Sequence, residues 1–142
     1  MLGGVEIPWN KGFEGHSDGD VLLHAVCDSL LGAAALGDIG KHFPNTDPRY
    51  KGMASLLLLK HVASLLAQHR YAVMNIDATV VLEEPKIAPF VDQMRENIAA
   101  TLTIAMQDVS IKATTQEGLG FVGEGKGAVA YAVASIIQQQ SR

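Results

Sequence analysis

The sequence predicts an α+β fold, in which helices cover a mixed β-sheet within a single domain. The chain has 142 residues, which is the usual size of one domain. Apolar residues make up 48% of it and charged residues only 18%, a composition that fills a core and excludes a disordered chain. Short segments with strand-like alternation are interspersed with longer segments of helical periodicity, which gives the mixed class.

The first half of the chain is expected to be mostly helical. Residues Met1–Ile7 resemble the end of a strand or hairpin that two glycines interrupt. A helix is expected over about 17–36, with Gly37 as its C-terminal stop. The segment 37–52 is rich in Gly, Pro, Asp and Asn and predicts a long loop, and Ala54–His69 predicts a second helix.

The second half is expected to contain two strands, over Val73–Leu82 and over Asp108–Thr114, and apolar and polar residues alternate in the second of them. A third helix over Pro89–Ala105 would connect them, since proline suits the first turn of a helix. The glycine-rich loop 118–127 is expected to lead into a final helix that ends near Gln139. The predicted elements therefore place helices against a sheet of mixed strand direction.

Charge and hydropathy exclude several classes of protein. The net charge of −4 argues against a nucleic-acid partner. The densest apolar stretch, Leu56–Leu59, ends at Lys60 and is far shorter than the roughly 18–20 residues of a membrane span, so no membrane partner is expected. The single cysteine, Cys27, excludes a disulfide framework and a thiolate zinc cluster and fits a reducing compartment. We expect a cytoplasmic protein, or one of the plastid stroma in a plant.

A polar stripe on the first predicted helix is the most informative local pattern. Asp20, His24 and Asp28 follow one another at intervals of four residues, so they share one helix face. Imidazole is a common metal ligand, and a nearby carboxylate can fix its tautomer, so the pattern is compatible with a metal site. Ser17 and Asp20 also have the spacing of a capping box, and His24 could be a core residue satisfied by Asp28. The stripe alone leaves both interpretations open.

Two loops carry further candidate residues. The loop 37–52 holds Asp38 and Asp47 among glycines and prolines, and such loops often bind ligands, but the residues alone favour an ordinary solvated connection. The segment Thr114–Glu117 ends a predicted strand, where hydroxyls and backbone N–H groups could hold phosphate and a carboxylate could bind Mg²⁺. Turn chemistry at a strand end would explain the same residues. The pattern Gly118–Gly123 matches a dinucleotide fingerprint but lacks the second strand and the later acid, so we reject that interpretation.

Three segments together resemble the 2-C-methyl-D-erythritol 2,4-cyclodiphosphate synthase family. They are HSDGDVLLHAVCDSLLGAAALGDIGKHFPNTDP, NIDATVVLEEPKIAPFVDQMR and VSIKATTQEGLGFVGEGKG, in the family's order and over nearly the whole chain. The resemblance implies cyclisation of 4-diphosphocytidyl-2-C-methyl-D-erythritol 2-phosphate with release of CMP. It also implies a homotrimer with active sites between subunits, a zinc ion (or Mn or Co) in the protein site, and Mg²⁺ on the diphosphate of the cytidine substrate.

The resemblance also assigns roles to individual residues. It implies that His16 and Thr115 are catalytic, that His24 binds zinc or another divalent ion, and that Glu117 contacts Mg²⁺. The residues that it places against the substrate are His16, Ser17, Asp38, Gly40, Phe43, Asp47, Pro85, Lys86, Ile87, Ala88, Thr114, Thr115, Glu117 and Phe121.

Two departures from the family pattern bear on function. The family's N-terminal strand carries an Asp-x-His pair that completes the metal site, and the domain 1–142 is expected to lack it. Glu124 stands where family members can carry an arginine in the central cavity of the trimer, which argues against binding of isoprenoid diphosphates there. The leading hypothesis is the active synthase. The alternatives are a catalytically impaired trimer that binds cytidine nucleotides, and a structural trimer without a small ligand.

Overall fold

A three-stranded mixed sheet organises the fold. The computed structural model describes residues 1–8, 19–115, 117–120 and 127–140. Strand β1 (Tyr71–Val81) is central, with β2 (Val109–Thr114) parallel to it on one side and β3 (Val129–Gln138) antiparallel on the other. A single small domain with a mixed sheet and covering helices is therefore confirmed.

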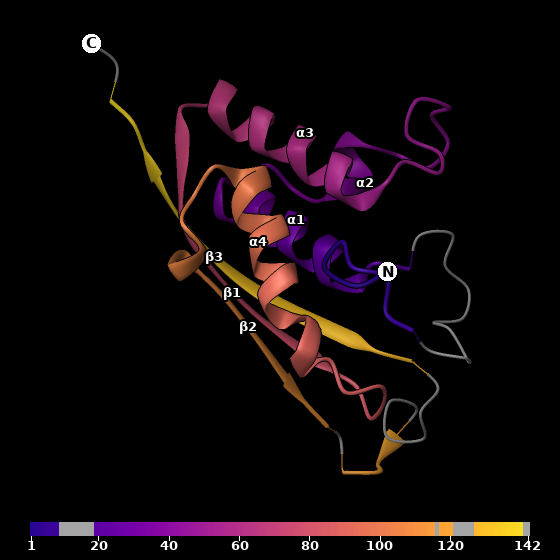
Figure 1. Ribbon diagram of the computed structural model, residues 1–142. Coiled ribbons are helices and arrows are strands. Elements are labelled where there is room, and N and C mark those ends of the chain that lie inside the picture. Colours follow the sequence, from indigo (N-terminus) through magenta and orange to yellow (C-terminus); the bar gives the residue numbers. More distant parts are fainter. Residues whose placement is uncertain (9–18, 116, 121–126, 141–142) are drawn as a thin grey trace.

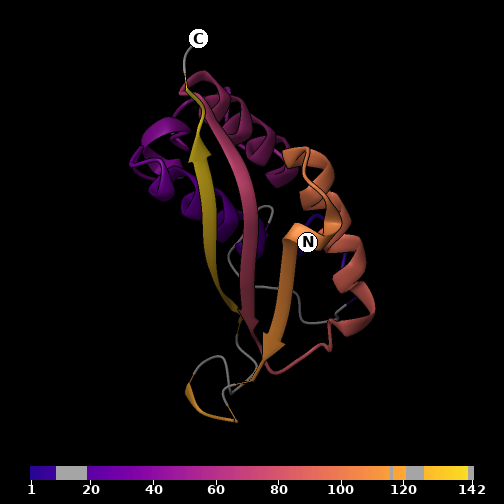
Figure 2. The same ribbon diagram turned by 90° about the vertical axis from the view of Figure 1, so that its left-hand side faces the viewer.

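The helices cover one face of this sheet. The three longer helices, α1 (Val21–Ala33), α3 (Ser55–Gln68) and α4 (Val91–Leu102), pack on that face (Figure 1). The short helix α2 (Ile39–His42) follows α1, and 3₁₀ turns over Ala88–Phe90 and Met106–Asp108 flank α4. No helix in the described part of the chain covers the opposite face of the sheet (Figure 2).

Apolar residues at helical spacing explain why α1 and α3 form and why they pack together. In α1, Leu22, Val26 and Leu30 are fully buried, as are Leu59 and Val62 of α3. Burial of each such side chain contributes roughly 1.5–3 kcal/mol, so the two helices are anchored mainly by their leucine-rich faces. The prediction for α3 is confirmed to within one residue at each end.

The start and end of α1 correct the prediction of a helix over 17–36. Asp20 is the N-cap, because its carboxylate accepts a hydrogen bond from the Leu23 N–H at 3.0 Å. Residue 17 lies outside the described part of the chain. At the other end Ala35 takes a left-handed conformation (φ 57°), and the Leu36 N–H donates to the Leu31 carbonyl at 2.8 Å. The helix therefore ends at Ala33, before Gly37.

The N-terminal segment forms a tight turn held by the same aspartate. Leu2 and Val5 form an isolated antiparallel bridge around Gly3 and Gly4, which have φ values of 58° and 75°. The carboxylate of Asp20 accepts the Gly3 N–H at 2.9 Å and the Gly4 N–H at 2.8 Å. Asp20 is 1% exposed, so one buried carboxylate connects this turn to the start of α1.

The prediction of a final helix is wrong, because residues 129–138 form strand β3. The many alanines favoured a helix, but exposure alternates along the segment: Tyr131 and Val133 are 65% and 70% exposed, whereas Ala132 and Ala134 pack against the core. Ten consecutive positions lie beside β1, whose hydrogen bonds override the helical propensity of alanine. The alanines face α1 and leave room for that helix to approach the sheet.

Candidate active site

The predicted site residues fall into two groups. The helical group consists of His24, Asp38, Gly40, Phe43 and Asp47, on α1, on α2 and its cap, and in the loop that follows. The sheet-end group consists of Pro85, Lys86, Ile87, Ala88, Thr114, Thr115 and Glu117, where β1 and β2 end. The two views show α2 and the C-terminal ends of β1 and β2 well apart (Figures 1 and 2). His16, Ser17 and Phe121 lie outside the described residues.

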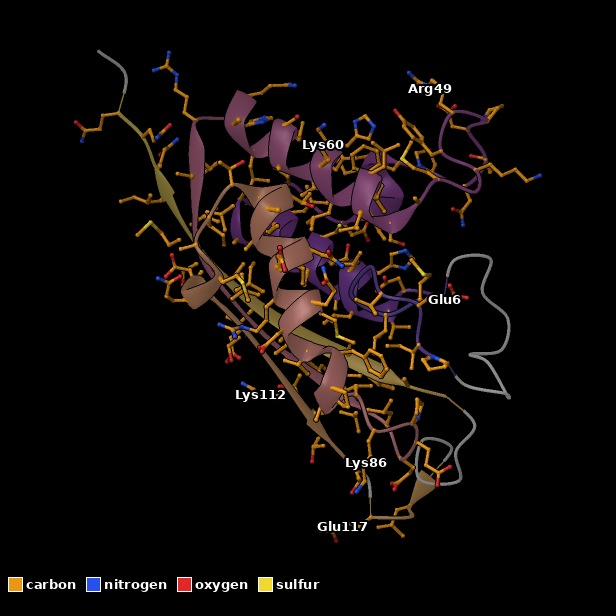
Figure 3. All side chains as sticks on the ribbon, in the orientation of Figure 1. Glu6, Arg49, Lys60, Lys86, Lys112 and Glu117 are labelled. Carbon is orange, nitrogen blue, oxygen red and sulfur yellow. The ribbon has the colours of Figure 1, made fainter. Side chains whose placement is uncertain are left out.

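Parallel pairing of β1 and β2 assembles the sheet-end group. Val81 pairs with Thr114 at the end of both strands, and the Leu82 N–H donates to the Thr114 carbonyl at 3.0 Å. Because the carboxyl ends of parallel strands meet at one edge, the loops that follow them lie next to each other. Lys86 and Glu117, from the two loops, lie at this same end of the sheet (Figure 3).

The loop after β2 presents oxygen atoms to solvent. Thr115 and Glu117 are both exposed, and the Glu117 N–H donates to the Thr115 hydroxyl at 3.2 Å. Glu117 has a φ of 53°, which places it in the left-handed region. The next residue, Gly118, donates its N–H to the carboxylate of Glu83 at 3.1 Å. An exposed carboxylate can bind a hard cation such as Mg²⁺, and a nearby hydroxyl can donate a hydrogen bond to a phosphate oxygen.

The loop after β1 combines a buried anchor with exposed positions. Ile87 is 1% exposed and its side chain lies in the core, so only its backbone remains for a ligand. Lys86 and Ala88 on either side of it are exposed, and Pro85 is half-buried after a cis peptide bond. Burial of Ile87 anchors the loop to the core, while the exposed Lys86 leaves an ammonium group at the edge of the sheet.

The polar stripe of α1 serves mainly to shape the chain. Asp20 accepts hydrogen bonds from three backbone N–H groups and is itself the N-cap, so the helix begins after Asp20 and not near Ser17 as the capping-box spacing had indicated. Asp28 accepts the Ile39 N–H at 2.9 Å and so ties α2 to α1. His24 is half-buried, and its Nε2 lies 3.3 Å from the hydroxyl of Ser55, a residue only 6% exposed at the start of α3.

In the loop region of the helical group, the carboxylates of Asp38 and Asp47 also accept hydrogen bonds from nearby residues. Asp38 caps α2 by accepting the Lys41 N–H at 3.0 Å. Asp47 accepts hydrogen bonds from the side chain and backbone of Arg49, which lower the pKa of its carboxyl group. Phe43 packs edge-on to Tyr50, with ring centroids 5.2 Å apart. On its other side a cavity of about 220 Å³ is lined by Phe43 and residues of α2 and α3.

Neither a complete metal shell nor a thiol nucleophile is found among the described residues. No group of three or more His, Cys, Asp or Glu side chains in that part of the chain could hold a metal ion. His24 offers one imidazole ligand of the type that zinc accepts, but the other donors are not assembled around it there. Cys27 is fully buried, and burial, followed by the charges of Asp28 and Asp20, raises the pKa of its thiol. It is therefore a core residue, as predicted.

Two residues near the site were not predicted from the sequence. Ser55 contacts His24 from a helix that begins 31 residues further along the chain, and Glu83 contacts Gly118 across 35 residues. No spacing rule connects residues so far apart.

None of the helices in the described part of the chain has the length and apolar content that a membrane span requires.

The fold and the two groups define a small α+β domain with oxygen-rich loops at one edge of a mixed sheet. A profile of the YgbB family matches residues 1–137, and the chain belongs to this family. It is 62% identical over 136 residues to the 2-C-methyl-D-erythritol 2,4-cyclodiphosphate synthase of Chloroherpeton thalassium, covering 96% of this chain and 87% of that protein. The resemblance drawn from the three sequence segments is thus confirmed.

Solved structures show the same fold. The chain matches the IspF–CDP complex of Plasmodium falciparum with a TM-score of 0.85 and 33% identity, over 99% of this chain and 84% of that one. It matches the bifunctional IspDF of Campylobacter jejuni with a TM-score of 0.90 and 40% identity, over 96% of this chain. The match spans 37% of the bifunctional chain.

Proposed function

We propose that the chain cyclises 4-diphosphocytidyl-2-C-methyl-D-erythritol 2-phosphate to 2-C-methyl-D-erythritol 2,4-cyclodiphosphate with release of CMP, in non-mevalonate isoprenoid biosynthesis. Its family and the names of its relatives support this activity, and the CDP-bound neighbour supports a cytidine nucleotide as ligand. The single observation that carries the proposal is the sheet-end group, in which Lys86, Thr115 and Glu117 gather on two adjacent loops. The comparisons give no support to the catalytically impaired alternative.

The reaction needs positioning and charge compensation more than covalent chemistry. An oxygen of the 2-phosphate attacks the β-phosphorus, a new P–O bond forms, and the bond to the CMP phosphate breaks. Both partners are anionic, so groups that neutralise charge and align the attack supply most of the rate. In this proposal Thr115, with His16, stabilises the transition state. Lys86 and the backbone of 85–88 hold the cytidine end with Thr114.

The helical group would bind the remainder of the substrate. Asp38 and Gly40 are proposed to hold the methylerythritol hydroxyls, with Ser17, Phe43, Asp47 and Phe121 completing the pocket. Asp38 and Gly40 are exposed beside the short helix α2, which is compatible with contact to a polyol. Since one chain places the two groups well apart, we propose that each active site combines the helical group of one subunit with the sheet-end group of another.

The uncovered face of the sheet supports assembly into a homotrimer. Tyr131, Val133 and Ile137 project from β3 away from the helices and are 65%, 70% and 52% exposed. Large apolar patches of this kind mark protein interfaces more often than free surface. We propose that residues 1–142, as one synthase-like domain, associate through this face. Glu124, which would concern the central cavity of the trimer, lies outside the described residues.

Divalent ions are part of the proposal. His24 would bind zinc, or manganese or cobalt, and Glu117 would contact Mg²⁺ on the diphosphate; such ions supply positive charge to the reacting phosphates. The contact with Ser55 at 3.3 Å supports His24, because ligand histidines commonly use their second nitrogen to hold an outer partner. The described residues do not supply a complete set of metal ligands around His24.

The test is incubation of the purified protein with the substrate and Mg²⁺, followed by ³¹P NMR. The expected result is a cyclic diphosphate together with an equal amount of CMP. A protein that binds CDP in calorimetry yet releases no CMP would establish the impaired alternative. Failure to bind any cytidine nucleotide would favour a purely structural trimer. We expect this activity in the cytoplasm, or in the plastid stroma of a plant.

A further inference from the structure

Glu83 lies between the two loops of the sheet-end group. It stands two residues after the end of β1 and two residues before Pro85. Its carboxylate oxygen accepts the Gly118 N–H at 3.1 Å, although Gly118 belongs to the loop after β2. One residue earlier in the chain, the Leu82 N–H donates to the Thr114 carbonyl at 3.0 Å and joins the same two segments through the backbone. The side chain of Glu83 thus continues the connection between the segments beyond the end of the ladder.

This contact acts on the backbone of Glu117. Glu117 has a φ of 53°, a left-handed conformation that is unfavourable for a non-glycine residue. Hydrogen bonds on both sides of it maintain that conformation: its own N–H donates to Thr115 Oγ1 at 3.2 Å, and the next N–H donates to Glu83. Gly118 itself has a φ of 81°, which suits glycine. The direction of the Glu117 side chain therefore depends on Glu83.

We propose that Glu83 is a positioning residue of the active site, which couples the cytidine-binding loop 85–88 to the Mg²⁺-contacting loop at Glu117. The inference rests on the proposed function, because Glu117 and loop 85–88 take their roles from it. Glu83 does not touch the reacting atoms in this account. It acts through the Gly118 N–H, and what it supplies is a hydrogen-bond acceptor at a fixed place.

The experiment compares Glu83→Ala and Glu83→Gln with the unmodified protein. We expect Glu83→Ala to raise the Mg²⁺ concentration for half-maximal rate about threefold to tenfold, the effect of losing one exposed hydrogen bond. Glu83→Gln keeps an acceptor oxygen and should restore the Mg²⁺ dependence to within about twofold. The control is Glu96→Ala, an exposed carboxylate on α4, which removes the same charge and should leave the Mg²⁺ dependence unchanged.

A second measurement does not depend on turnover. In ¹H–¹⁵N NMR the Gly118 amide proton should move upfield in Glu83→Ala and stay near its original position in Glu83→Gln. An unchanged Gly118 resonance, or an unchanged Mg²⁺ dependence in an active Glu83→Ala protein, would overturn the inference. Equal losses in the Gln and Ala variants would also overturn it, since the amide retains the acceptor. An inactive unmodified protein would instead refute the proposed function.

Discussion

The helical group and the sheet-end group are built in different ways. Around the helical group, carboxylates form short-range contacts: Asp28 holds the Ile39 N–H, Asp38 caps α2, and Asp47 pairs with Arg49. At the sheet end, Thr115 and Glu117 are exposed on the loop after β2, where hydrogen bonds to Thr115 and Glu83 hold the backbone and leave the Glu117 side chain at the surface. The first region is shaped before a ligand arrives, whereas the second offers its polar atoms to one. Removal of a buried contact near the helical group should therefore lower stability, whereas substitution of an exposed residue at the sheet end should lower catalysis.

The largest expected effect tests the catalytic side of this contrast. Glu117→Gln removes an exposed charge at the proposed Mg²⁺ contact, so we expect kcat/KM to fall about 100-fold or more, as for other groups that stabilise transition-state charge. The melting temperature should not change, because the side chain is exposed. Steady-state kinetics and thermal denaturation measure the two quantities. A large loss of stability with little loss of activity would contradict the contrast.

The next effect tests the structural side. Asp20→Ala leaves the N–H groups of Gly3, Gly4 and Leu23 without their acceptor in a buried site, so the free energy of unfolding should fall by about 2–4 kcal/mol. Urea denaturation measures it. Asp92→Ala serves as the control, since that side chain is 86% exposed. Equal midpoints for the two variants would show that Asp20 does not stabilise the turn.

A third prediction concerns His24, which both contacts Ser55 within the fold and is the proposed metal ligand. His24→Ala should weaken binding of the site's divalent ion by at least about tenfold while the fold remains intact, because an imidazole ligand is lost and its neighbour Ser55 can be hydrated. Metal analysis after dialysis and circular dichroism provide the measurements. His69→Ala, at the exposed end of α3, is the matched control. An unchanged metal content in His24→Ala would refute the ligand assignment.

The smallest effect concerns pH. The hydrogen bonds from Arg49 lower the pKa of Asp47 in the folded protein, so their contribution is present above the carboxyl group's unfolded pKa and is lost as pH falls through the folded value. Both side chains are solvent-accessible, so the contribution should be slight. Asp47→Asn should therefore show the parent's melting temperature at neutral and at acidic pH. A clear drop at neutral pH alone would show that this loop is more tightly structured than its contacts indicate.

The sequence predicts what depends on local periodicity. The leucines of α1 and α3 and the alternation of β1 and β2 each mark an element without reference to the rest of the chain. Strand β3 could not be recognised in this way, because alanines are compatible with either state and only pairing with β1 decides between them.

The same limit applies to the site. The spacing of Asp20 from Ser17 and His24 indicated either a cap or a metal site, and the hydrogen bond from the Leu23 N–H identifies Asp20 as the cap. The family resemblance supplied the two groups of residues. Their separation within one chain, and the contact between Glu83 and Gly118, depend on tertiary arrangement that no local pattern encodes.

The alanines of β3 have a consequence for the imidazole of His24. The methyl groups of Ala132 and Ala134 lie between the sheet and α1, and their small size sets the distance at which α1 packs on the sheet. A larger side chain at either position, such as valine, would move α1 away from the sheet and displace His24 with it. The position of His24, the proposed metal ligand, thus depends in part on two small residues of β3 that have no proposed role in the site.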